Sequence, residues 1–395
     1  MKVLLAAAVC LASNLFAGNG AISQLVDEGY DHFYNLEYDA AQSDFEKAAA
    51  LNPADPDLHN HLAENIVFRE MYRDGALESE LVTGNNSLLR RAKLNPTPET
   101  RRQFLGEIQK ALDLEQARLR KNPNDIAALY AMGITCGLRA NYYFLVQKAW
   151  LDALRDSTTA RKMHNRVSEL DPSNVDARLV QGLDDYVVGS LPPFYRMCGF
   201  LIGFHGDKDR GIRTVEDVAA HGTINRIDAA VFLAAIFRRE HKPAKALPFL
   251  NDLIARFPRN YLLRFELAGM YSALGDKQKA IECVETVAHL KASGAPGYAR
   301  VPAWTIYYQL GTIEFWYNDL SEALGNMQKV TAHADEVDLN TGVLAWMRVG
   351  QIYDLTRRHA LAIEAYKKAI AYAPEAEAAR ESRRYISSPY RREKS

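Results

Sequence analysis

Apolar and small residues recur with a helical period along most of the chain, and the segment 344–374 shows the pattern clearly. Its first predicted helix carries Trp346, Val349, Gly350 and Tyr353 on one face, and its second carries Ala362, Tyr366 and Ala369. Gly350 and Ala362 would let two antiparallel helices approach closely, while the aromatic residues fill the space between successive pairs. Pro374 ends the second helix because proline lacks a backbone N–H. The pattern therefore predicts a helical hairpin.

Four further segments repeat this frame. The matching positions are Gly29, Ala41, Phe45, Ala48 and Pro53; Ala234, Phe237, Ala246, Leu250, Leu253 and Pro258; Leu267, Ala268, Tyr271, Ala280, Val284 and Val287; and Leu310, Gly311, Ala323, Met327 and Val330. Ala246 and Ala280 are 34 positions apart, and the longer step from Ala280 to Ala323 follows from the inserted "KASGAPGYARVP". Repetition at this period indicates stacked helical repeats.

Three more helix pairs are predicted between residues 57 and 223, each with extra residues between its two helices. Their first helices are "LHNHLAENIVF", "ALYAMGITCGL" and "ARLVQGLDDYVV", and their second helices are "ALDLEQARLRKNP", "TARKMHNRVSELDP" and "RGIRTVEDVAAHG". Together with one pair in 18–56 and four in 227–376, this gives about eight pairs. Because no Ser-, Gly- or Pro-rich linker separates them, we expect one continuous all-α, right-handed α-solenoid with inserts in pairs two to four. Inserts in such folds often form the binding face.

The repeated frame resembles the tetratricopeptide repeat, whose pattern is W-x2-L-G-x2-Y, then A-x3-F-x2-A, then P. A narrower resemblance begins at "GLDDYVVGSLPPFYRMCGFLIGFHGDKDRG" and covers about residues 175–290. There the chain is similar to the eukaryotic inclusion-body-clearance family of tetratricopeptide proteins, which share a Leu-Pro-Pro turn and a Gly-Phe-x-Gly-Asp turn. That family is cytosolic, so the resemblance implies a shared detail of fold and no shared partner.

The whole chain also resembles bacterial tetratricopeptide proteins that carry signal peptides, through "REMYRDGALESELVTGNNSLLRRAKLNP" and "DLNTGVLAWMRVGQIYDL". Residues 1–17 have the three parts of such a peptide: Lys2, the short apolar run 3–11, and Ala17 at a small-residue cleavage site. No later stretch is apolar enough to predict a transmembrane segment. We therefore expect export to a periplasm or secretion. Cys136, Cys198 and Cys283 remain after cleavage and are predicted to be small buried side chains.

Charge is almost balanced, with 48 basic and 49 acidic residues and a net charge of −1. A nucleic-acid binder normally has a basic excess, so the composition argues against nucleic acid as a partner. The local exception is the basic tail, residues 377–395. Its arginines are expected to keep a loose end solvated.

Signatures of chemistry are sparse. The sequence holds no GxSxG, HExxH, P-loop or GxGxxG motif. His59, His61 and Glu64 form only a partial set of zinc ligands on an ordinary repeat helix. In "HGDKDRG", Gly206 is expected to permit a left-handed turn, and Asp207 or Asp209 to cap the following helix. We therefore expect no metal, no cofactor and no enzyme activity.

Aromatic and polar residues in the inserts are the candidate partner-binding residues. They are Tyr142, Tyr143, Trp150, Tyr186, Phe194, Tyr195, His205 and Asp207. The aromatic side chains either fill the core beneath the inserts or anchor a partner peptide in the concave groove. The favoured function is a scaffold that binds a protein or peptide, and two alternatives stay open. One is a small-ligand binder or enzyme that uses a pocket formed by residues 190–210, and the other is a structural subunit of a cell-envelope assembly.

Overall fold

The computed structural model describes residues 20–75, 77, 94–190, 206–333 and 336–392. The chain divides into two compact units, one ending at Pro258 and the other beginning at Arg259. Each described element is a helix, so the prediction of an all-α fold is confirmed for these residues. None of the described helices is long and apolar enough to cross a membrane.

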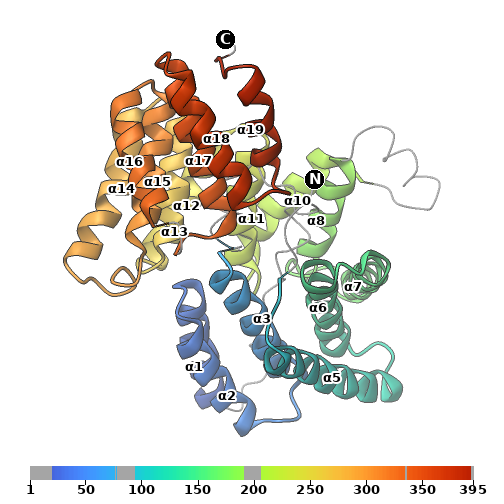
Figure 1. Cartoon of the computed structure of the whole chain (residues 1–395). Helices are drawn as coiled ribbons and strands as arrows, with labels where there is room; N and C mark the ends of the chain where they lie inside the picture. Colours follow the sequence, from blue (N-terminus) through green and yellow to red (C-terminus); the bar gives the residue numbers. More distant parts are fainter. Residues whose placement is uncertain (1–19, 76, 78–93, 191–205, 334–335, 393–395) are drawn as a thin grey trace. The chain divides into compact units, whose positions relative to one another are not determined.

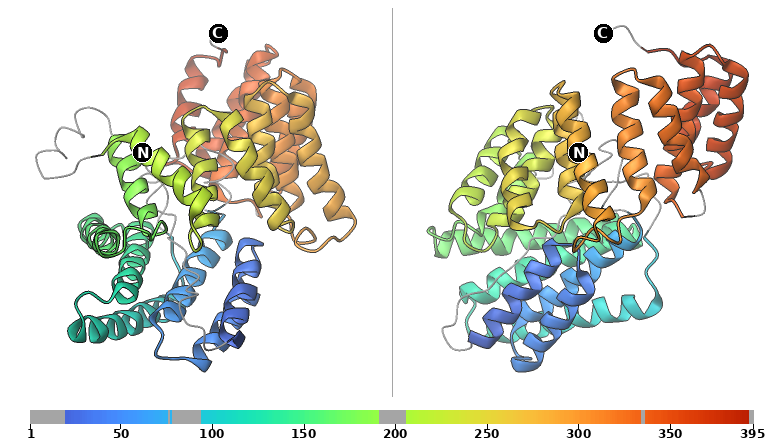
Figure 2. Two further views of the ribbon diagram at one scale, coloured as in Figure 1. Left: turned by 180° about the vertical axis from the view of Figure 1, so that it is seen from behind. Right: turned by 90° about the vertical axis from the view of Figure 1, so that its left-hand side faces the viewer.

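The first unit contains five packed helix pairs (Figures 1 and 2). Their helices are α1 (Gly20–Tyr34) with α2 (Tyr38–Leu51), α3 (Pro56–Arg73) with α5 (Pro98–Lys121), α6 (Ile126–Tyr142) with α7 (Trp150–Leu170), α8 (Arg178–Gly189) with α10 (Lys208–His221), and α11 (Arg226–Arg239) with α12 (Pro243–Arg256). A short π-helix, η3 (Tyr143–Gln147), follows α6.

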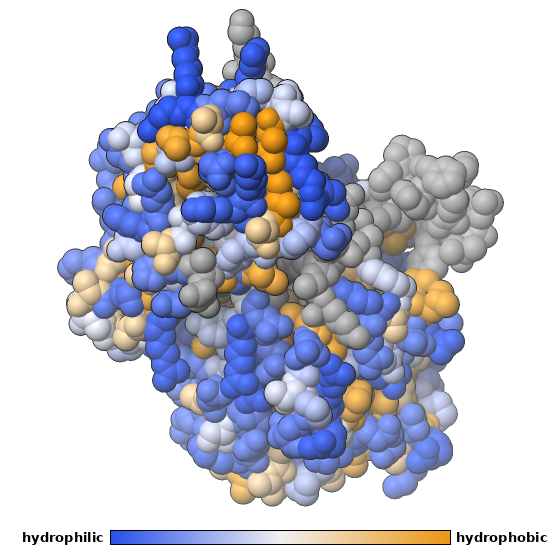
Figure 3. Space-filling view, viewed as in Figure 1, coloured by the Kyte–Doolittle hydropathy of each residue, from blue (hydrophilic) through white to orange (hydrophobic). Residues whose placement is uncertain are grey.

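The second unit contains three pairs and a final helix. They are α13 (Tyr261–Ala273) with α14 (Lys277–Ala292), α15 (Ala303–Trp316) with α16 (Leu320–Ala332), α17 (Leu339–Leu355) with α18 (His359–Tyr372), and α19 (Glu377–Ser387). The eight predicted pairs are therefore all present among the described residues. Polar side chains cover most of the face seen in Figure 3, and apolar ones lie there in small groups.

Three of the pairs close where a glycine of the first helix meets a ring of the second. A Cβ on Gly29 would lie 2.4 Å from the Phe45 ring, and one on Gly350 would lie 2.4 Å from the Tyr366 ring. The same arrangement places Gly133 against His164. Glycine is required at these positions because any larger residue would overlap a buried ring.

Side-chain caps fix where several helices begin. Asp55 accepts the Asp57 N–H at the start of α3, and Asp125 accepts the Ala128 N–H at the start of α6. Asp338 does the same for α17 by accepting two N–H groups. A carboxylate at this position satisfies N–H groups that have no partner within the helix.

The basic tail differs from the expected loose end, because residues 377–387 form α19 and pack on α18 and α17. Ala379 is fully buried, and the Tyr385 ring lies 5.5 Å from that of Tyr366. Beyond the helix, the Tyr390 N–H donates to Asp354 Oδ2 at 2.8 Å. The small residues of α19 face the stack while its arginines face solvent, so an amphipathic pattern was present within the basic composition.

Candidate functional site

The eight predicted partner-binding residues fall into three groups. Phe194, Tyr195 and His205 lie outside the described residues. Tyr142 and Tyr186 are core residues, exposed by 3% and 0%, so their rings offer no surface for direct contact. Tyr143 is half-buried, while Trp150 and Asp207 are exposed. The interpretation of aromatic core filling therefore describes Tyr142 and Tyr186, and the binding prediction stays a prediction for the others.

The insert between α6 and α7 carries an exposed apolar surface, which we call the α7 patch: Trp150, Leu151 and Leu154. Their exposed fractions are 42%, 79% and 46%. Positions three and four residues apart along a helix share one side of it, so Leu154 is a neighbour of both Leu151 and Trp150. Exposed apolar side chains that cluster, instead of lying singly, are typical of interaction surfaces.

The backbone before the α7 patch is held in an unusual conformation. Lys148 has φ of 55°, in the left-handed region that side chains disfavour. The buried Phe144 ring packs edge-on against Trp150 with 4.7 Å between ring centroids. Strained backbone of this kind persists only where surrounding packing enforces it, and it is concentrated at functional sites. The insert is thus a fixed support for Trp150.

Two contacts explain why the insert stays in place, one to α5 of the preceding pair and one between α6 and α7. Tyr142 stacks on Phe104 with 4.4 Å between centroids. Arg139 donates to both oxygens of Asp156, at 2.5 and 2.8 Å, and its guanidinium lies 6.0 Å from the Tyr143 ring centroid. Hydrogen bonds from the guanidinium to Asp156 raise the pKa of Arg139 further above its usual range.

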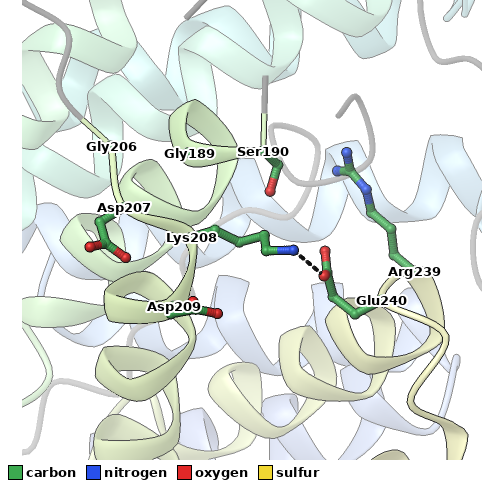
Figure 4. A pocket seen from close by; sticks show the side chains of 8 residues that line it. All are labelled: Gly189, Ser190, Gly206, Asp207, Lys208, Asp209, Arg239 and Glu240. Atoms are coloured by element: carbon green, nitrogen blue, oxygen red, sulfur yellow. Dashed lines mark hydrogen bonds and ion pairs between the residues drawn. The ribbon is translucent and has the colours of Figure 1, made fainter. Parts of the chain in front are cut away.

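A second candidate site is a cavity of about 540 Å³ where α8 ends, α10 begins and α11 ends (Figure 4). Eight described residues line it: Gly189, Ser190, Gly206, Asp207, Lys208, Asp209, Arg239 and Glu240. The chain segments approach so closely there that a Cβ on Gly206 would lie 2.5 Å from the Gly189 nitrogen. Gly206 does not have a positive φ, so the expected left-handed turn is wrong and lack of space explains this glycine.

Two of the three acidic groups that line this cavity, Glu240 and Asp207, have internal partners. Glu240 accepts the Tyr186 hydroxyl at 3.0 Å and Lys208 Nζ at 2.5 Å. Although burial opposes ionisation, these hydrogen bonds lower the pKa of the Glu240 carboxyl. Asp207 caps α10 by accepting the Arg210 N–H at 2.9 Å, which lowers its pKa and confirms the capping interpretation.

His59 and His61, which were considered as metal ligands, form hydrogen bonds to other side chains of the helix stack. His59 Nδ1 lies 2.6 Å from Glu107 Oε2. His61 Nδ1 lies 2.7 Å from the Tyr30 hydroxyl, and burial lowers the His61 pKa to about 3. Within the part of the chain that the structure describes, no three His, Cys, Asp or Glu side chains converge as metal ligands would. The absence of a metal stays a prediction.

A buried polar cluster joins α3, α5 and α6 and was missed from the sequence. Glu115 is fully buried, and its Oε1 lies 2.5 Å from Thr135 Oγ1. The same hydroxyl lies 2.8 Å from Asn60 Oδ1. Burial raises the Glu115 pKa to about 8. The three residues belong to three different helices, so no local spacing could have linked them.

The packed helix pairs place the protein in the class of α-helical repeat proteins. Tetratricopeptide-repeat models match residues 26–64 and 343–375. The first range covers the second half of α1, all of α2 and the first half of α3, and the second covers most of α17 and all of α18. The chain is therefore a tetratricopeptide-repeat protein, a fold that serves protein-interaction scaffolds. No curated protein matches the chain.

Solved structures also match most of the chain, at low similarity. A tetratricopeptide-repeat protein from Parabacteroides merdae is 15% identical, with a TM-score of 0.33, and the match covers 82% of this chain and 98% of that one. Yeast Tom70 is 13% identical with a TM-score of 0.37, covering 93% and 95%. The human IFIT1 dimer with m7Gppp-AAAA is 14% identical with a TM-score of 0.45, covering 94% and 81%. Such scores support no inference about ligands.

Proposed function

We propose that this protein is a non-enzymatic scaffold that binds a protein or peptide partner outside the cytoplasm. The observation that carries the proposal is the α7 patch, an exposed Trp150 next to Leu151 and Leu154 on a repeat framework. A few residues, often Trp, Tyr or Arg, supply most of the binding energy at protein interfaces. The fixed backbone around Lys148 adds to this, because a preorganised anchor loses little entropy on binding.

The partner's chemistry follows from the patch. An apolar ridge on a helix matches the apolar face of a second amphipathic helix or an apolar side chain of an extended peptide. Asp152 and Arg155 are exposed by about half or more on the same helix and would form a polar rim. An apolar centre inside a polar rim is the usual anatomy of a reversible interface.

The test is retention of envelope proteins by the protein without residues 1–17, compared with a Trp150→Ala, Leu151→Ala variant. We expect the variant to bind a retained partner at least about tenfold more weakly, because an aromatic anchor is lost. The matched control is Trp316→Ala, Leu339→Ala, which removes one exposed Trp and one exposed Leu in the second unit. Equal loss in both double variants, or in neither, contradicts the assignment to α7. Phe194→Ala, Tyr195→Ala tests the other predicted anchors in the same assay.

Export is a separate part of the proposal and rests on residues 1–17. A fusion of residues 1–40 to alkaline phosphatase, which is active only outside the bacterial cytoplasm, should be active. The mature protein should begin at Gly18. Substitution of Leu4 and Leu5 by Arg should abolish the activity, because the apolar run is what export requires.

The cavity at α8, α10 and α11 favours a second candidate function, the binding of a small ligand. Its volume of about 540 Å³ lies within the usual range for such sites, roughly 300–1,000 Å³. A screen of metabolites by thermal denaturation tests this candidate. If no metabolite in the screen raises the melting temperature, the scaffold function explains the protein better than small-ligand binding does.

A further inference from the structure

We infer that the cavity at α8, α10 and α11 is a carboxylate-binding site in which Arg239 and Ser190 are the recognising groups. The first observation is a guanidinium without an acidic partner. Arg239 Nη1 is buried and has no hydrogen-bond partner. Its neighbour Glu240 is already engaged through both oxygens, by Tyr186 and by Lys208. The Arg239 guanidinium lies 5.7 Å from the centroid of the Tyr186 ring, and its charge also acts on the nearby Glu240 carboxylate.

The second observation concerns the hydroxyl of Ser190, which is also a buried donor. Ser190 Oγ is buried and makes no hydrogen bond of good geometry, although it lies near the Tyr186 hydroxyl, and Ser190 lines the same cavity as Arg239. Figure 4 shows the Ser190 oxygen and the Arg239 side chain bordering the space beside the Lys208–Glu240 pair. Buried donors without partners are uncommon and destabilising. A bound oxyanion would satisfy both donors.

The charges around the cavity select the kind of anion. Its lining carries two cationic side chains, Lys208 and Arg239, and three acidic ones, Asp207, Asp209 and Glu240. Lys208 neutralises Glu240, the Asp207 carboxylate caps α10, and Asp209 is exposed to solvent, so the Arg239 guanidinium is the cation that remains for a ligand. The nearby aspartates would repel a doubly charged phosphate more strongly than a singly charged carboxylate. A planar carboxylate also matches the fork of a guanidinium.

The source of the carboxylate rests on the proposed function: a peptide partner would supply its C-terminus or an acidic side chain. A free organic acid has the same chemistry. The test uses two fluorescent pools of random hexapeptides, one with a free C-terminal carboxylate and one amidated, in fluorescence anisotropy titrations. Sodium propionate and sodium phosphate serve as competitors at equal ionic strength.

We expect the wild type to bind the free-carboxylate pool at least about tenfold more tightly than the amidated pool, because a charge-assisted hydrogen bond is lost in the amide. Arg239→Gln should remove this difference, Arg239→Lys should keep part of it, and Ser190→Ala should reduce it severalfold. Propionate should compete, whereas phosphate should not. The control Arg213→Gln removes the same charge from an exposed position of α10 and should bind as the wild type does.

Circular dichroism checks that each variant is folded. If both pools bind the wild type alike but propionate raises its melting temperature and not that of Arg239→Gln, the site is supported with a free acid as its ligand. If peptides bind and Arg239→Gln behaves as the wild type in every arm, the carboxylate site is refuted while the scaffold function stands. Tighter competition by phosphate than by propionate also overturns the assignment.

Discussion

The buried Glu115 cluster leads to a prediction about pH and stability. The Thr135 hydroxyl has a single proton, yet three oxygens surround it: Glu115 Oε1, Asn60 Oδ1 and the Ala131 carbonyl, at 2.5, 2.8 and 3.1 Å. A neutral Glu115 would supply a second proton by donating to Thr135 Oγ1, which leaves the Thr135 proton for Asn60. An ionised Glu115 has no proton to donate, so it would compete with Asn60 for the single Thr135 proton.

The charged surroundings support the neutral form. Burial is the main cause that raises the Glu115 pKa to about 8, and Asp57 on α3 raises it further. Arg118 lowers it from one turn along α5, but that guanidinium is engaged with Asp125 at 2.9 and 3.0 Å. Hydrogen bonds with Thr135 and Asn60 also lower the Glu115 pKa, but they do not offset burial, and Glu115 Oε2 has no hydrogen-bond partner.

The magnitude follows from linkage between proton binding and folding. The native state keeps the Glu115 proton up to about pH 8, while the unfolded chain releases it near pH 4.5. This contribution to stability is therefore complete below pH 4.5 and is lost as pH rises through 8. At about 1.4 kcal/mol per pH unit, the loss is about 3 kcal/mol between pH 4.5 and 7.

Glu115→Gln removes this titration and preserves the shape of the side chain, and its amide can donate to Thr135. We expect the variant to lie within about 1 kcal/mol of the wild-type free energy of unfolding at pH 5 and to be more stable than the wild type by about 4 kcal/mol at pH 8. Urea unfolding at both pH values measures this, with hydrogen exchange of α5 and α6 amides to assign the effect to the first unit. Asp113→Asn is the control, an exposed acid two positions away on α5. A difference between Glu115→Gln and wild type that does not change from pH 5 to 8 would refute the neutral carboxyl.

Three further predictions concern the repeat stack. Gly350→Ala should lower the free energy of unfolding by about 1 to 3 kcal/mol, because its Cβ would overlap the Tyr366 ring. A Cβ on Gly269 in α13 meets nothing within 4 Å, so Gly269→Ala should raise the free energy of unfolding by about 0.5 to 1 kcal/mol. Urea unfolding of the two variants measures both changes. His164→Phe should flatten the acid side of the stability profile: burial lowers the His164 pKa to about 4 from 6.5, so its contribution is present above pH 6.5 and is lost by about 3 kcal/mol as pH falls to 4. Unchanged acid sensitivity in the phenylalanine variant would contradict this assignment. Removal of residues 377–395 should lower the melting temperature, because α19 covers the fully buried Tyr366, and an unchanged melting temperature would show that the tail contributes nothing.

The helix pairs could be predicted from the sequence because their packing depends on residues at fixed offsets. Gly29 and Phe45 are separated by the same 16 positions as Gly350 and Tyr366, and both pairs make the close contact that the frame requires. Gly133 and His164 make the same kind of contact, but an insert between the two helices lengthens their separation in the sequence. His164 therefore occupies the position of a buried aromatic residue, a structural role that its residue type alone would not suggest.

The candidate sites were harder to predict because they depend on residues that are distant in sequence. Trp150 was predicted from its place in an insert, but Leu151 and Leu154 were not distinguished from ordinary helix residues. Arg239 and Ser190 are 49 positions apart and meet only through the packing of α8 and α11 around α10. An arginine that lacks a partner is visible only when the neighbouring Glu240 is seen to be engaged elsewhere.

The measurement that tests the central claim most directly is hydrogen exchange of the protein alone and saturated with a partner retained from the envelope fraction. The account predicts slower exchange in the amides of residues 143–154, around the α7 patch, and loss of that protection with Trp150→Ala, Leu151→Ala. Protection confined to other helices, with residues 143–154 unchanged, would contradict the claim that this patch is where the scaffold binds.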